Sequence, residues 1–134
     1  MGLSEKPSRM LLLSVILVLV WTTVAAAAML RTGSVPGDAL GTGGVACYVT
    51  NAGATAGTVS ATLYDMNGTA LESFPGGSVL VAAHATASTA FHSFTADSPA
   101  HCECVVPSAT TFRCAVVWFD KDNPAHTLTV VGTP

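Results

Sequence analysis

The part of this chain with the most chemical potential is His101–Phe119, which reads HCECVVPSATTFRCAVVWF. It holds Cys102, Cys104 and Cys114 beside a histidine, and the remaining cysteine is Cys47. Thiolate sulfur and imidazole nitrogen are ligands that suit copper(I) and zinc, whereas paired thiols in an oxidising compartment form disulfides. The stretch is therefore either a metal site or a set of structural bridges.

The spacing of the cysteines favours disulfides. If strands Cys102–Val106 and Phe112–Trp118 form a hairpin around the turn Pro107–Thr111, alternation places all three cysteines on one face. Pairing Val106 with Phe112 then puts Cys104 opposite Cys114, within reach of a cross-strand bond. The favoured connectivity is Cys47–Cys102 with Cys104–Cys114. The alternatives join Cys47 to Cys114 or Cys104 and leave Cys102 for the remaining thiol.

The metal alternative would use His101 with the nearby sulfurs. Its possible ligands are Cys102, Cys104, Cys114, His84, His92 and His126. Neighbouring strand residues point to opposite faces, so His101 does not easily join Cys102 at one ion, and the chain has no Cys-x-x-Cys pair. We therefore expect no bound metal and no other cofactor.

Motifs for catalysis are missing from the sequence. It contains no G-x-S-x-G, no H-E-x-x-H and no paired-carboxylate motif, and its histidines are scattered. Asp120, Asp122 and Asn123 resemble part of a calcium loop, but the glycine and the distal glutamate of an EF-hand are lacking. We expect a protein that is not an enzyme. The alternative is a secreted enzyme whose catalytic residues come together from distant positions.

The N-terminus has the layout of a secretory signal. Lys6 and Arg9 precede the apolar run Met10–Trp21, and small residues follow at Ala25–Ala28. This predicts a signal peptide over residues 1–28. An uncleaved membrane anchor over residues 10–30 is the alternative, because that length can span a bilayer. Either way the remaining chain lies outside: secreted or periplasmic, or held at the membrane by its N-terminal segment alone.

Composition limits the possible partners. The 134 residues suffice for one domain and carry five basic and eight acidic side chains, for a net charge of −3. Nucleic acid and anionic lipid surfaces require a lysine and arginine footprint that this chain lacks. An unknown protein or surface partner is the remaining possibility.

Residues 29–44 are rich in turn residues and predict an N-terminal loop with at most a short edge strand. Residues 45–134 alternate with period two, which predicts strands. Val45, Cys47 and Val49 share one face, as do Val59, Ala61 and Leu63.

Turn signals divide the rest of the domain. Asn67-Gly68 predicts a hairpin between Thr58–Met66 and Thr69–Phe74. The alanine-rich stretch that follows predicts strands Val79–Ala82 and Thr86–Phe91, with a helix as the competing interpretation. With the final strand TLTVV, this gives seven or eight strands, for which an antiparallel β-sandwich is the simplest architecture.

One apolar strip is predicted on the outside of this domain. Val117 and Phe119 face away from Cys114 and Trp118, and Val105 would lie beside them across the hairpin. Exposed apolar strips can mark partner sites. The alternative is that the loop over residues 120–126 or the N-terminal segment covers the strip.

The pattern CYVTNAGATAGTVSATLYDMNGTALES resembles the strand, Asn-x-Gly, strand and hairpin unit of immunoglobulin-like sandwiches. Together with VLVAAHATASTAF and HCECVV…TFRCAVVWFD, it is similar to small exported bacterial sandwich proteins of unknown function. In these, one early and one late cysteine bracket the core, and Cys47 and Cys102 occupy those places here. The pair Cys104 and Cys114 departs from that pattern. The resemblance implies an immunoglobulin-like fold and no particular activity. The expected function is that of an exported, non-catalytic module with a structural or binding role.

Overall fold

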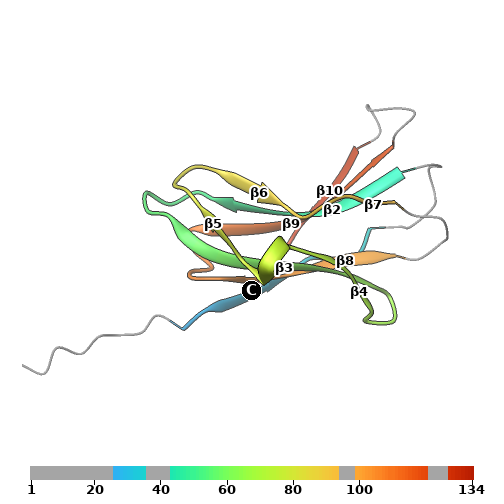
Figure 1. Ribbon diagram of the computed structural model, residues 1–134, viewed down its shortest axis with the longest axis horizontal. Helices are drawn as coiled ribbons and strands as arrows, with labels where there is room; N and C mark the ends of the chain where they lie inside the picture. Colours follow the sequence, from blue (N-terminus) through green and yellow to red (C-terminus); the bar gives the residue numbers. More distant parts are fainter. Residues whose placement is uncertain (1–25, 36–42, 94–98, 121–126) are drawn as a thin grey trace, which may run out of the picture.

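The computed structural model describes residues 26–35, 43–93, 99–120 and 127–134. These residues form an all-β fold of two antiparallel sheets that lie face to face, in the manner of a β-sandwich (Figure 1). Most of the predicted signal peptide, and the loop that contains Asp122, Asn123 and His126, lie outside the described residues.

Each sheet has five strands. The first sheet has the order β1-β8-β3-β4, with β5 also paired to β3. Its strands are β1 (Ala28–Arg31), β8 (Ala100–Val106), β3 (Gly57–Asp65), β4 (Ala70–Ser73) and β5 (Val79–Val81). The second sheet has the order β10-β9-β2-β6, with β7 also paired to β2. Its strands are β10 (Thr127–Val131), β9 (Phe112–Asp120), β2 (Gly43–Asn51), β6 (Thr86–Ser88) and β7 (His92–Ser93).

Alternation along the long strands builds one core between the sheets. The predicted inward faces of β2 and β3 are confirmed, because each of their apolar members is almost fully buried. The inward face of β9 contributes Phe112, Val116 and Trp118 to the same cluster. β3 and β9 thus bury one face and leave the other partly exposed, whereas β2 is buried on both sides over Gly43–Cys47.

The hairpin predicted from Asn67-Gly68 is confirmed as β3 and β4. Gly68 has φ = 81°, a conformation that glycine adopts without a steric penalty. Asp65 closes the turn, since its Oδ1 accepts the N–H groups of Asn67 and Thr69, each at 2.8 Å. Residues within the turn are therefore sufficient to define this hairpin.

The alanine-rich stretch forms strands and no helix: it gives β5 and β6, with His84 at the turn in a left-handed conformation (φ = 58°). β5 pairs with β3 and β6 with β2, so the chain crosses here from the first sheet to the second. Buried Asn51 fixes this crossing, because its Nδ2 donates to Thr55 O at 2.8 Å and to Val81 O at 3.2 Å.

The described residues contain ten strands, more than the seven or eight expected. The additional strands are the short edge strands β1 and β7. β1 begins at the last residue of the predicted signal peptide and runs into the segment expected to hold at most a short edge strand, and β7 lies in a segment predicted as a loop. Such short pieces lack a period-two pattern long enough to recognise, and they form by pairing with their long neighbours β8 and β2.

The hairpin predicted for His101–Phe119 is wrong. β8 pairs with β1 and β3 in the first sheet, while β9 pairs with β2 and β10 in the second. Pro107–Thr111 is therefore an arch between the sheets. The Arg113 guanidinium supports the arch: its Nη1 donates to the carbonyl oxygens of Ala109, Thr110 and Phe112 at 3.1, 3.1 and 2.9 Å. A five-residue link suits either connection, so turn residues alone did not distinguish them.

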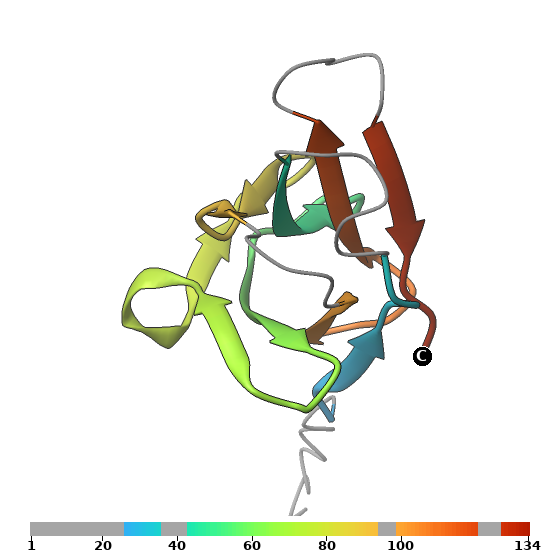
Figure 2. The same ribbon diagram turned by 90° about the vertical axis from the view of Figure 1, so that its right-hand side faces the viewer.

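The two sheets also meet at one corner. Arg31 at the end of β1 and Thr133 just beyond β10 exchange both backbone hydrogen bonds, each at 3.1 Å. Figure 2 shows β1 beside the C-terminal end of the chain. Arg31 and Thr133 thus join the two sheets on the side opposite to the β5–β6 crossing.

Candidate functional site

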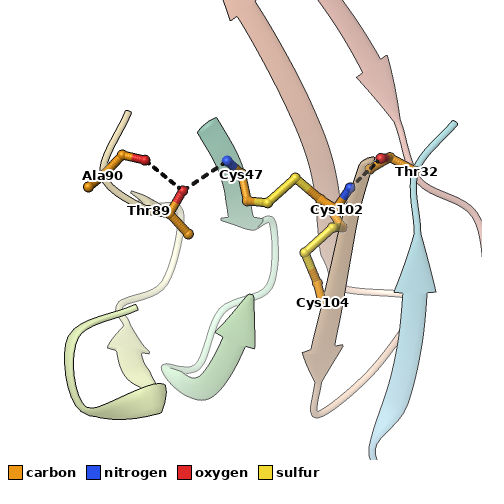
Figure 3. The surroundings of a disulfide bond; sticks show 7 residues. Thr32, Cys47, Thr89, Ala90, Cys102 and Cys104 are labelled. Atoms are coloured by element: carbon orange, nitrogen blue, oxygen red, sulfur yellow. Dashed lines mark hydrogen bonds between the residues drawn. A yellow bond between two sulfur atoms is a disulfide. The ribbon is translucent and has the colours of Figure 1, made fainter. Parts of the chain in front are cut away.

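The cysteines form two disulfides, Cys47–Cys102 and Cys104–Cys114, which is the connectivity that the spacing favoured. All four residues are 0% exposed. Cys47 lies on β2 and Cys102 on β8, inner strands of opposite sheets, and their Cα atoms are 5.7 Å apart. This bridge crosses the core from one sheet to the other (Figure 3).

The second bridge also joins the sheets. Cys104 lies on β8 opposite Ala61 of β3, whereas Cys114 lies on β9 opposite Val49 of β2. Their Cα atoms are 6.0 Å apart. The expected pairing within one hairpin is therefore replaced by pairing across the core. Cys104 pairs with Cys114 in the predicted hairpin and in the structure alike, because in both cases the two side chains point into the core.

A buried threonine accompanies each half of the Cys47–Cys102 bridge (Figure 3). On the second sheet, Thr89 N–H donates to Cys47 O at 2.9 Å, and Cys47 N–H donates to Thr89 Oγ1 at 3.1 Å. On the first sheet, Thr32 N–H donates to Cys102 O at 3.0 Å, and Cys102 N–H donates to Thr32 Oγ1 at 2.8 Å. We call Thr32 and Thr89 the threonine clamps.

The threonine clamps lie where the edge strands are irregular. Thr89 lies between β6 and β7, and Thr32 lies between β1 and the bridge of Val35 to Ala100. At such an irregularity a backbone acceptor moves away from the ladder, and the threonine hydroxyl takes its place. Both cysteine amides are therefore satisfied although the neighbouring edge strand is broken.

No described cysteine is unpaired, so these residues provide no thiolate to bind a metal ion. His101 lies on the outer face of the first sheet, where its ring stacks on Tyr64 with centroids 5.7 Å apart. Among the described residues, no group of three or more His, Cys, Asp or Glu side chains could hold a metal ion.

Val105 is separated from the other two residues of the predicted partner strip. It lies on the outer face of the first sheet, next to Met29 of β1. Arg31 and Glu103 form an ion pair one row away, with Nε and Oε1 at 2.7 Å. This face therefore combines an apolar row, an ion pair and the Tyr64–His101 stack.

Val117 and Phe119 lie on the outer face of the second sheet, across the molecule from Val105. Phe91 covers part of this face: its ring contacts those of Phe119 and Tyr48, with centroids 4.4 and 6.4 Å apart. Gly44 makes room for Phe119, because a Cβ there would lie 2.7 Å from the ring. The predicted cover by residues 120–126 falls largely outside the described residues. Sequence reasoning missed Phe91, which lay at the predicted end of a strand.

Two further polar contacts lie outside the core, at the edges of the sheets and at the β3–β4 turn. His92 Nδ1 on β7 and Glu72 Oε1 on β4 are 3.3 Å apart and link one edge of each sheet. The backbone N–H of Thr69, with those of Asn67 and Gly68, holds the pKa of the Asp65 carboxyl below its ordinary value of 3.8.

Comparison with protein-family models, with curated proteins and with solved structures gave no match to this chain. In the part of the chain that the structure describes, no helix is long and apolar enough to cross a membrane. The two disulfides are typical of an oxidising, extracellular environment.

Proposed function

We propose that this chain is an exported, non-catalytic module of the immunoglobulin-like sandwich kind, with a structural or binding role. The observation that carries the proposal is that every cysteine is used to join the two sheets through the core. Bridges of this kind form and persist in secreted and periplasmic proteins, where the surroundings are oxidising.

Two features support the immunoglobulin-like assignment. The Cys47–Cys102 bridge joins inner strands of opposite sheets, and Trp118 is buried in the same core. Immunoglobulin domains combine an inter-sheet disulfide with a buried tryptophan in this way. The assignment concerns the fold and implies no particular ligand.

In this proposal the outer sheet faces are the binding surfaces. The face with Val117 and Phe119 also carries Phe91, which is 48% exposed. Aromatic side chains bury much area at little entropic cost, which is why they dominate many binding surfaces.

The deciding experiment is the intact mass of the protein purified from its native compartment, measured before and after reduction. The proposal expects a chain that begins near Ala28 or Met29 and gains two hydrogens for each disulfide on reduction. A retained leader in a membrane fraction would favour the anchored alternative, with the domain still outside. Four free thiols in a cytosolic fraction would overturn the proposal.

A further inference from the structure

The first strand of the domain begins where the predicted signal peptide ends. Ala26 and Ala27 are exposed and lie outside the sheets, whereas Ala28 is the first residue of β1. Ala28 pairs with Val106 of β8 and packs against the core. A cut between Ala27 and Ala28 therefore leaves β1 whole, while a cut after Ala28 removes the residue that pairs with Val106.

The sequence alone allows both cuts. Signal peptides end in small residues, at the last position and two positions before it. For a cut before Ala28 these residues are Ala25 and Ala27. For a cut before Met29 they are Ala26 and Ala28. Because only the first cut preserves β1, the structure favours a signal peptide of residues 1–27.

Contacts along its length hold β1 in the sheet. Leu30 is 2% exposed and belongs to the core. Arg31 exchanges backbone hydrogen bonds with Thr133, and the threonine clamp that follows, Thr32, bonds the backbone of Cys102 (Figure 3). Proteolysis within a folded element proceeds through a transiently opened state. The chain just after the cut is therefore withheld from a protease once β1 is docked.

We propose that the bond between Ala27 and Ala28 is the site at which the signal peptide is removed, and that this bond is cut only before β1 docks onto β8. The reaction is hydrolysis: the amide C–N bond breaks, and water supplies a hydroxyl to the Ala27 carbonyl carbon and a proton to the Ala28 nitrogen. The inference rests on the proposed export and deepens it, because it names the bond and the strand that controls its cutting.

Docking of β1 does not require the cut. Ala26 and Ala27 are exposed and the strand pairing begins at Ala28, so β1 can dock while the signal peptide is still attached. Docking first shields the bond, whereas cutting first frees the end of β1. The order of the two events therefore decides whether the domain is released or stays attached to its signal peptide.

The test measures how fast a purified signal peptidase in detergent cuts the full-length chain, and intact mass reports which bond is cut. The natural chain is presented folded and oxidised, and also reduced and freshly diluted from denaturant. Leu30→Ala loosens β1, because it removes core contacts of that strand. Val81→Ala is the matched control, since Val81 is also 2% exposed and lies on a short edge strand of the same sheet, β5.

We expect the unfolded chain to be cut between Ala27 and Ala28, and the folded chain to be cut at least about ten-fold more slowly. Leu30→Ala should speed the cutting of the folded chain at least about ten-fold, because the rate follows the population in which β1 is open. Val81→Ala should change this rate less than about two-fold, because β8 and β3 separate β5 from β1.

A product that begins at Met29 overturns the proposed site. A folded chain that is cut as fast as the unfolded chain overturns the control by β1, and so does equal acceleration by Leu30→Ala and Val81→Ala. Where Leu30→Ala does not fold, Thr32→Val decides, since it replaces only the hydroxyl that bonds Cys102 and should speed the cutting at least about five-fold. The proposed function fails on a different observation, free thiols in a cytosolic fraction.

Discussion

At the scale of single residues, the threonine clamps accept hydrogen bonds from the buried backbone N–H groups of the bridged cysteines. A disulfide fixes two side chains, but the backbone amides of Cys47 and Cys102 still need acceptors in a core that excludes water. Thr89 and Thr32 provide these acceptors and also bond the cysteine carbonyls. Both halves of the bridge are held in the same way, although they come from different sheets.

Replacing a clamp hydroxyl by a methyl group should therefore destabilise the domain. Thr89→Val leaves the Cys47 amide buried without its acceptor and should lower the free energy of unfolding by roughly 1–3 kcal/mol. Thr89→Ser keeps the hydroxyl and loses only a methyl group, so it should cost less. Urea denaturation measures both, and Thr32→Val and Thr32→Ser repeat the comparison on the first sheet. Equal losses for valine and serine would contradict this role of the hydroxyl.

At the scale of elements, the sequence was informative where structure is local. Asn67-Gly68 determines the β3–β4 hairpin through backbone conformation, and alternation determines which faces of β2, β3 and β9 are buried. The same alternation turned the cysteines toward the core and so selected the right partners.

What the sequence did not reveal depends on contacts between distant segments. Whether Pro107–Thr111 is a hairpin turn or an arch depends on which strands accept β8 and β9, and no residue within the link decides that. The Arg113 contacts that support the arch are visible only once it is formed. The predicted hairpin likewise placed Val105 beside Val117 and Phe119. Because β8 and β9 lie in different sheets, these residues lie on two opposite faces.

The β3–β4 hairpin should carry a pH dependence of its own. Because turn N–H groups hold the pKa of Asp65 below 3.8 in the folded protein, the ionised carboxylate favours folding. This stabilisation is complete above the unfolded-state pKa and is lost as the pH falls through the lower, folded-state pKa. Asp65→Asn keeps an acceptor oxygen but removes the charge. The variant should therefore be less stable than the natural chain at neutral pH, and the difference in the free energy of unfolding should shrink in acid.

Two measurements check this. Thermal unfolding of both proteins between neutral and acidic pH gives the difference in stability, and an NMR titration of the Asp65 carboxyl gives its pKa directly. A constant difference across the pH range, or an Asp65 pKa at or above its ordinary value, would show that the turn does not favour the carboxylate.

At the scale of the whole molecule, the two disulfides hold the sheets together, and so do the β5–β6 crossing, the Pro107–Thr111 arch and the corner at Arg31 and Thr133. The crossing at Asn51 and the corner at Arg31 and Thr133 lie on opposite sides, and the disulfides lie in the core between them. The bridges close chain segments of very different length, with sequence separations of 55 and 10 residues.

Removing the bridge that closes the longer chain segment should therefore lower the free energy of unfolding more. Loop entropy assigns about 4 kcal/mol to the Cys47–Cys102 closure and about 3 kcal/mol to Cys104–Cys114. The double variants Cys47→Ala with Cys102→Ala, and Cys104→Ala with Cys114→Ala, compare them directly. All four sites are fully buried, so the cavities left behind are alike. Denaturant unfolding of both variants should rank them in this order, and the reverse order would show that native-state contacts outweigh loop closure.

The two bridges also lie in series, because only Glu103 separates Cys102 from Cys104. A pull applied to the chain ends would travel along the covalent path from Cys47 through sulfur to Cys102, past Glu103, and through sulfur again from Cys104 to Cys114. The residues between Cys47 and Cys102, and those between Cys104 and Cys114, are outside this path and feel no tension while the sulfur bonds last. Under tension the oxidised domain can lengthen only through the segments before Cys47 and after Cys114, which include β1 and β10, whereas reduction would also release the segments that the bridges close.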